Sequence, residues 1–181
     1  MSDEREKGKD RPTGENPIRL ELESATGSHH DLSRPLDLSV RITNVSDEPI
    51  WMVGVLPGSE GLRYPQYQVE IEGPSGPVGM RFPEGLDYAR GLRPEDFVRL
   101  APGESFDPQQ GKGFVPIQKL AWFQPSEKGA YRMRLRLDAT SEDVREWMGH
   151  TPVRDQRKVE SLLRQVPHVS AESNTLEIVF D

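Results

Sequence analysis

The sequence contains no cysteine, and this absence excludes several kinds of chemistry. A disulfide framework, a catalytic thiol and a thiolate metal site all require cysteine. The sequence also lacks a run of about 18 apolar residues, the length that a membrane-spanning helix needs. It shows no apolar segment typical of a signal peptide. We therefore expect no membrane span, and the compartment stays open because removal of an export signal would leave a chain of this kind.

Positive charge is in the minority. The chain carries 23 Lys and Arg against 30 Asp and Glu, a net charge of −7 at pH 7. This balance disfavours a general attraction to phosphate backbones, so we expect no nucleic-acid partner. The glycines Gly73, Gly76 and Gly79 are interrupted by Pro74 and Pro77 and do not lead into a helix. They do not form a phosphate-binding loop, and we predict no cofactor.

Glycine and proline, by contrast, are frequent, with 16 of each in 181 residues. They interrupt the chain at intervals that are too short for long helices and suit short strands. The length fits one domain. Residues 1–16 contain no large apolar residue after Met1, which is typical of a disordered polar tail. We therefore predict a tail over 1–16 and one folded domain over 17–181.

The clearest pattern in the chain is the alternation of residues 129–138. Apolar residues fall on one face and charged residues on the other: Tyr131, Met133, Leu135 and Leu137 against Arg132, Arg134, Arg136 and Asp138. This period of two predicts a strand with one buried and one solvated face, in an antiparallel sheet. Residues 36–42 and 176–180 alternate in the same way, and we expect both to pair with it.

Other segments have the composition of short strands bounded by turns. We predict further strands over 18–23, 36–45, 50–56, 67–72, 97–100 and 104–106, and one more near 114–117 or 120–123. Residues 78–96 are interrupted by glycine and proline, so we predict a long loop there. Trp51 and Trp122 lie within apolar runs and are expected in the core.

Residues 100–105, 129–135 and 173–180 resemble the last strands of bacterial immunoglobulin-like β-sandwich domains. Residues 44–50 are similar to the turn after the second strand of such domains. The resemblance implies an all-β fold, an antiparallel immunoglobulin-like β-sandwich, in which Tyr131 bonds to an upstream backbone group as a tyrosine corner. Proteins with a similar sequence pattern include bacterial intracellular proteinase inhibitors and uncharacterised exported modules.

The chain departs from this family pattern before its last strand. Residues 140–149 contain a capping residue, early acidic side chains and a terminal glycine, which predict a short helix. Residues 155–166 carry apolar side chains at helical spacing: Val159, Leu162, Leu163 and Val166. We predict a small helical insertion over about 140–167. Two interpretations are open, a structural lid on the sheets or a recognition element.

Trp147 lies in this insertion, and its role has two possible interpretations. It fastens the helix to the sheet, or it is an exposed anchor for a partner, since aromatic residues are enriched in binding hot spots. Arg132, Arg134 and Arg136, together with Arg99, also allow two interpretations. They form a solvated face paired with acidic residues such as Glu177, or they bind an anionic ligand.

The residues His29, His30 and Asp31 are metal-ligand types, but adjacent side chains rarely converge and no third ligand follows at a usual spacing. Ser28 beside His29 and Asp31 is no triad, because nucleophile, base and orienting group must meet in space. We predict no metal site and no catalytic residue.

Three hypotheses for function follow. The first, and our prediction, is a non-catalytic interaction or accessory module that binds a protein partner through Trp147, Arg132, Arg134 and Arg136. The second is a proteinase inhibitor whose exposed loop, such as 78–96, enters a protease cleft. The third is an enzyme with carboxylates or histidines in a cleft beside the insertion. Neither the identity of the partner nor the oligomeric state is encoded in a recognisable motif.

Overall fold

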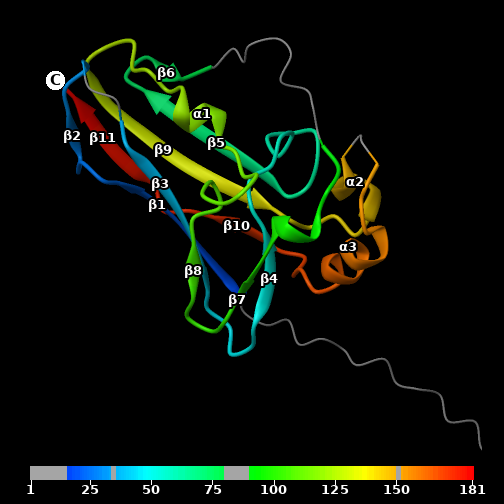
Figure 1. Cartoon of the computed structure of the whole chain (residues 1–181). Coiled ribbons are helices and arrows are strands. Elements are labelled where there is room, and N and C mark those ends of the chain that lie inside the picture. Colours follow the sequence, from blue (N-terminus) through cyan, green and yellow to red (C-terminus); the bar gives the residue numbers. More distant parts are fainter. Residues whose placement is uncertain (1–15, 34–35, 80–89, 150–151) are drawn as a thin grey trace, which may run out of the picture.

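A computed structural model describes residues 16–33, 36–79, 90–149 and 152–181. The fold is mostly β, with antiparallel pairing throughout except between β2 and β11, which are parallel (Figure 1). The strands are β1 (Ile18–Ser24), β2 (His29–His30), β3 (Leu38–Asn44), β4 (Ile50–Val53), β5 (Gln66–Gly73), β6 (Gly76–Pro77), β7 (Phe97–Leu100), β8 (Ser105–Phe106), β9 (Gly129–Asp138), β10 (Ser170–Glu172) and β11 (Leu176–Phe180). The helices are the 3-10 helix η1 (Pro94–Asp96), α1 (Gln118–Ala121), α2 (Val144–Met148) and α3 (Gln156–Leu163).

The described residues form three sheets. One has the order β1-β3-β8, the largest has the order β2-β11-β9-β5-β6 with β10 also paired to β9, and the third is the pair β4-β7. Residues 1–15 of the predicted tail and 80–89 of the predicted loop lie outside the described residues. No helix in the described part of the chain is long and apolar enough to cross a bilayer.

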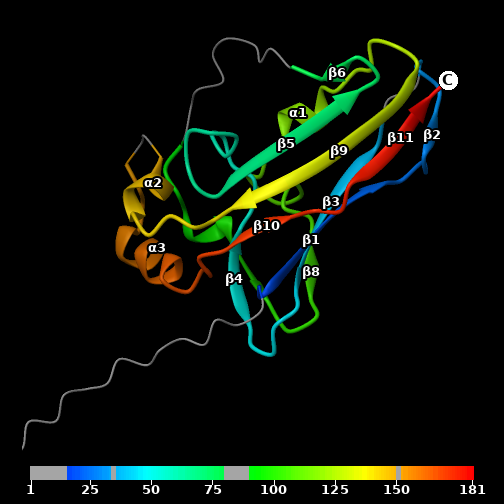
Figure 2. The same cartoon turned by 180° about the vertical axis from the view of Figure 1, so that it is seen from behind.

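The predicted strand over 129–138 is confirmed as β9, at the centre of the largest sheet (Figure 2). Its apolar residues are buried and its arginines are exposed. β11 pairs with it as expected, but the prediction that 36–42 also pairs with it is wrong. β3 lies in the other sheet beside β1, and the second neighbour of β9 is β5. Alternation identifies the buried face of a strand, and it carries no information on which strand lies next to it.

The buried sides of the two larger sheets meet in one apolar cluster. Its strand residues include Leu20 and Leu22 from β1, Val40 and Ile42 from β3, Tyr67 and Val69 from β5, Met133, Leu135 and Leu137 from β9, and Ile178 and Phe180 from β11. Asn174 also links the sheets: Leu22 N donates to its Oδ1 at 2.9 Å, and its Nδ2 donates to Leu22 O at 3.0 Å. This amide side chain pairs with backbone groups at the free edge of β1.

No strand forms at 114–117 or 120–123, contrary to the sequence-based prediction: residues 114–117 are irregular and α1 occupies 118–121. Ile117, Leu120 and Phe123 are buried at intervals of three, which suits a helical turn. Trp122 therefore points away from the core and is 44% exposed, so its expected core position is wrong. Trp51 is partly buried and packs against a second apolar cluster.

This second cluster contains the predicted helical insertion, which α2 and α3 form between β9 and β10. Val159, Leu163 and Val166 are buried there, together with Trp147 from α2. Loops from elsewhere in the chain also bond the end of α2: Tyr64 N donates to Glu146 O at 2.9 Å and Leu92 N to Met148 O at 3.2 Å. The apolar face of α3 therefore packs against the domain.

Candidate functional site

The candidate site is the solvent-facing side of the largest sheet, where β9 presents the three arginines singled out in the sequence. Cross-strand neighbours on both sides of β9 are acidic and exposed: Glu70 and Glu72 on β5, Glu172 on β10 and Glu177 on β11. The site is rigid because alternate residues of the same strands are buried in the core. The exposed charges thus lie on a fixed backbone.

Three exposed ion pairs connect the arginines to these glutamates. Arg132 Nε lies 3.4 Å from Glu177, Arg134 Nη1 lies 3.3 Å from Glu172, and Arg134 Nε lies 4.0 Å from Glu70. Pairs of this kind contribute about 0–1 kcal/mol each, because water screens both partners. The expected pairing of the stripe with acidic neighbours, including Glu177, is confirmed. Arg136 forms no ion pair within the described ranges.

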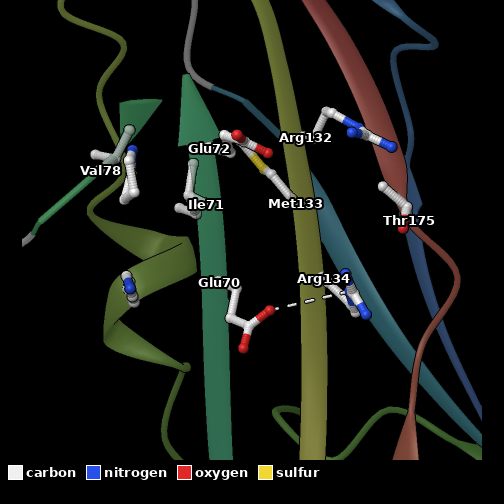
Figure 3. A pocket seen from close by; sticks show the side chains of 10 residues that line it. Glu70, Ile71, Glu72, Val78, Arg132, Met133, Arg134 and Thr175 are labelled. Atoms are coloured by element: carbon white, nitrogen blue, oxygen red, sulfur yellow. Dashed lines mark ion pairs between the residues drawn. The ribbon is translucent and has the colours of Figure 1, made fainter. Parts of the chain in front are cut away.

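A shallow depression of about 360 Å³ crosses this face over β5 and β9 (Figure 3). It is lined by Glu70, Ile71, Glu72, Pro77, Val78, Lys119, Arg132, Met133, Arg134 and Thr175. Three of the lining side chains are cationic and two are anionic, so the depression has a positive excess on a chain whose net charge is −7. Figure 3 shows Arg132 and Arg134 on the side of β9 where Thr175 also lies, with Arg134 joined to Glu70 by an ion pair.

Lys119 reaches the depression from α1, and Glu60 holds the start of that helix. Gln118 N donates to Glu60 Oε2 at 2.9 Å and Lys119 N approaches Oε1 at 3.4 Å. Burial raises the pKa of Glu60, and the two backbone donors and the Lys119 charge oppose that rise. The carboxylate therefore positions one wall of the depression through backbone contacts.

Two other residues that the sequence associated with this site lie elsewhere. Arg99 is exposed on β7, in the two-stranded sheet, and does not extend the arginine stripe. Trp147 is 3% exposed, and its Nε1 donates to Ser141 O at 3.0 Å. The interpretation of Trp147 as an exposed anchor is wrong, because its ring packs in the second cluster near Tyr64, at a centroid distance of 6.0 Å.

The two adjacent histidines point to different environments, as expected on a strand. His29 is exposed, with Nδ1 3.9 Å from the Asp181 carboxylate. His30 is buried and its Nε2 lies 2.8 Å from Thr26 Oγ1. Within the described ranges, no group of three or more His, Asp or Glu side chains is arranged to hold a metal ion.

No pattern in the sequence predicted the arginine cluster formed by Arg63, Arg90, Arg93 and Asp96, in which Arg63 and Asp96 are buried and Arg90 and Arg93 are partly exposed. The Asp96 carboxylate accepts from both Nη atoms of Arg90 at 2.7 and 2.8 Å and from Arg93 Nη2 at 2.9 Å. Arg63 is 1% exposed and donates to the backbone carbonyls of Arg90 and Trp147. The cluster joins three segments that are far apart in the chain, and no periodic pattern marks such a contact.

Burial and hydrogen bonding together shift the pKa values of this cluster. Burial alone would raise the pKa of Asp96, but the hydrogen bonds from Arg90 and Arg93 outweigh it and lower that pKa. Burial also lowers the pKa of Arg63 to about 10, and repulsion from Arg90 adds to this effect. Because the guanidinium of Arg63 bonds to carbonyls and the other two bond to Asp96, the cluster connects loops to α2 and is a structural feature.

Comparison of the chain with protein-family models, with curated proteins and with solved structures gave no match.

Proposed function

We propose that this chain is a non-catalytic interaction module, built on an immunoglobulin-like β-sandwich, that binds a protein partner through the outer face of β5, β9, β10 and β11. The observation that carries the proposal is the charged depression over β5 and β9, with its weakly engaged arginines on a rigid strand. Binding sites are typically placed on scaffolds that hold their side chains without further ordering.

Strand order supports the immunoglobulin-like part of the proposal. The orders β1-β3-β8 and β5-β9-β11 correspond to strands A-B-E and C-F-G of an immunoglobulin domain. Tyr131, at the start of β9, donates its hydroxyl to Glu127 O at 3.1 Å and accepts from Glu127 N at 3.3 Å. This is the upstream backbone bond of a tyrosine corner. The helices α2 and α3 are an addition to that pattern.

The arginines of the outer face can leave their glutamates and form ion pairs with a partner instead. Breaking an exposed pair costs little, since each contributes about 0–1 kcal/mol. A charged group of a partner, bound in an interface with less water, interacts with an arginine more strongly than the exposed glutamate does. The binding free energy then exceeds the cost of breaking the ion pair, if the partner's group meets a free edge of the guanidinium. The contact of Arg132 Nε with Glu177 is long, at 3.4 Å, and the Arg132 guanidinium forms no hydrogen bond with the described residues, so most of its five N–H donors are available to a partner.

The experiment compares two double variants that change the net charge equally. Arg132→Ser/Arg134→Ser removes charge from the proposed face, and Arg41→Ser/Arg99→Ser removes two exposed strand arginines elsewhere, on β3 and β7. We expect affinity capture from host extract, followed by reconstitution with the recovered purified protein, to show binding by wild type and by the Arg41/Arg99 variant. The Arg132/Arg134 variant should lose it while keeping the same unfolding midpoint as the control.

The proposal is wrong if the recovered partner binds all three proteins equally. It is also wrong if loss of binding by the Arg132/Arg134 variant accompanies a loss of structure that the Arg41/Arg99 variant does not show. Circular dichroism and the urea midpoint of each purified protein separate these cases.

A further inference from the structure

We infer that the partner presents an extended acidic segment that lies along β9 and binds the column formed by Arg132, Arg134 and Arg136. This inference rests on the proposed function, because it names the chemistry of the partner at the same face. Its first support is geometric. Side chains on one face of a strand recur about every 6.7 Å, twice the rise per residue, and an extended peptide has the same repeat.

An extended segment with acidic residues at alternate positions therefore places one carboxylate beside each arginine of the column. No other regular backbone matches this spacing along a strand so directly, because carboxylates on neighbouring turns of a helix are about 5.4 Å apart. The three guanidinium groups project from one strand whose intervening residues, Met133 and Leu135, are fully buried. The spacing of the column is therefore held by the core.

The second support is the number of unused donors. A guanidinium offers five N–H donors, and the structure engages few of them here. Arg132 lies 3.4 Å from Glu177 through Nε, and Arg134 contacts Glu172 through Nη1 at 3.3 Å and Glu70 through Nε at 4.0 Å. Arg136 forms no ion pair with a described residue. Carboxylates bind the free edge of such a group in a bidentate manner, with a stronger and more directional bond than the present 3.3 to 4.0 Å contacts.

The third support is the arrangement of charge around the column. In the depression itself Lys119, Arg132 and Arg134 outnumber Glu70 and Glu72. With Arg136, Glu172 and Glu177 included, the whole face carries four cationic and four acidic side chains, so the attraction for an acidic segment is confined to the line of the arginines. Glutamates flank the column on both sides, with Glu70 and Glu72 on β5 and Glu172 on β10. A ligand wider than one extended chain meets these carboxylates and is repelled. The pattern therefore selects a single narrow acidic segment and disfavours a broad polyanion such as a nucleic acid.

The test uses labelled synthetic peptides of roughly ten residues, enough to span the column in extended form. One alternates Glu and Ser, one has the same composition with all glutamates in a block, and one alternates Lys and Ser. We expect fluorescence anisotropy to show binding of the alternating Glu peptide, with affinity falling as salt rises. Binding should weaken at least about tenfold in Arg132→Ser/Arg134→Ser and stay unchanged in Arg41→Ser/Arg99→Ser.

Removing the flanking repulsion should have the opposite effect. Glu70→Gln/Glu172→Gln is expected to bind the alternating Glu peptide more tightly than wild type does. The inference is overturned if the Lys peptide binds instead, if the block peptide or a single-stranded DNA oligonucleotide binds as well as the alternating peptide, or if no peptide binds. Should the native partner still require Arg132 and Arg134 in those cases, the proposed function stands and only the acidic segment is excluded.

Discussion

The ring of Tyr131 occupies a central place in the first apolar cluster. It lies edge-on to Phe123 and Phe180, with centroid distances of 5.4 and 5.3 Å. Gly73 is adjacent, and a Cβ there would lie 2.8 Å from the ring, so glycine is needed for this close approach. The hydroxyl reaches the backbone of Glu127 just before β9 begins. One side chain therefore links the core to the turn that starts the central strand.

Replacing Tyr131 with phenylalanine should lower the free energy of unfolding by about 1 kcal/mol, because one hydrogen bond is lost while the ring still fills its site. Urea denaturation of both proteins measures the difference. An unchanged midpoint would show that the bond to Glu127 O contributes nothing to stability in solution.

Asp96 is the central residue of the arginine cluster, since its carboxylate accepts hydrogen bonds from the guanidinium groups of both Arg90 and Arg93. Asp96→Asn should destabilise the protein by about 3 kcal/mol at neutral pH, because it removes a fully buried carboxylate to which two partly buried guanidinium groups, those of Arg90 and Arg93, are bonded. Because the pKa of Asp96 is lower in the folded state, its stabilisation is fully present above the ordinary aspartate pKa of about 4 and is lost as pH falls through the folded value.

The measurement is the difference in unfolding free energy between wild type and Asp96→Asn across pH. We expect it to be constant above about pH 5 and to shrink below about pH 4. Glu60 and Asp107 have raised pKa values, chiefly through burial, and they act in the opposite direction. Both groups are present in the two proteins and cancel in the difference. A difference that does not change with pH would contradict the role assigned to the Asp96 carboxylate.

At the scale of elements, α3 is the segment whose contribution is easiest to isolate. It buries Val159 and Leu163 in the second cluster and exposes Arg157 and Lys158. Leu163→Ala should cost about 2–5 kcal/mol through lost burial and the cavity that remains. Lys158→Ala on the exposed side should stay within about 0.5 kcal/mol of wild type. Equal urea midpoints for the two variants would mean that the helix is not packed against the domain in solution.

The strands β10 and β11 are two consecutive strands that pair with the same edge of β9 and are separated by a short interruption. Both pair with the same side of β9, and Ser173 stands between them. Its N donates to Leu135 O at 2.8 Å, and Leu135 N donates to its Oγ at 2.9 Å. The side chain of Ser173 thus replaces a backbone acceptor. This interruption brings Asn174 to the edge of β1, where it joins the two sheets.

At the scale of the whole molecule, the two apolar clusters are connected rather than separate. Met52 belongs to the first and Val53 to the second, and they are adjacent on β4. Val169, just before β10, packs against both. We therefore expect one cooperative thermal transition by differential scanning calorimetry, with equal calorimetric and van't Hoff enthalpies. Two resolved transitions would indicate that the insertion unfolds independently of the sheets.

Local pattern predicted the long alternating strands and which of their faces are buried, but it also predicted a strand at 114–117 or 120–123 that does not form. The alternation of Tyr131, Met133, Leu135 and Leu137 identified β9 and placed its arginines in solvent, because the strand period is a property of the backbone itself. The helical spacing of Val159 and Leu163 likewise identified α3. The exposed half of the candidate site was therefore predictable from residues on one strand.

Only the tertiary structure decided which segments are neighbours. It paired β9 with β5 in place of residues 36–42, buried Trp147 and exposed Trp122, and brought the Arg63 guanidinium to the backbone carbonyls of Arg90 and Trp147. It also placed Lys119 and Thr175 beside the arginines to form the depression. Such contacts join residues that are far apart in the chain, and they depend on how all the buried faces fit together. A local pattern determines which face of a helix or strand is apolar, whereas the packing of the whole chain determines which other segments cover that face.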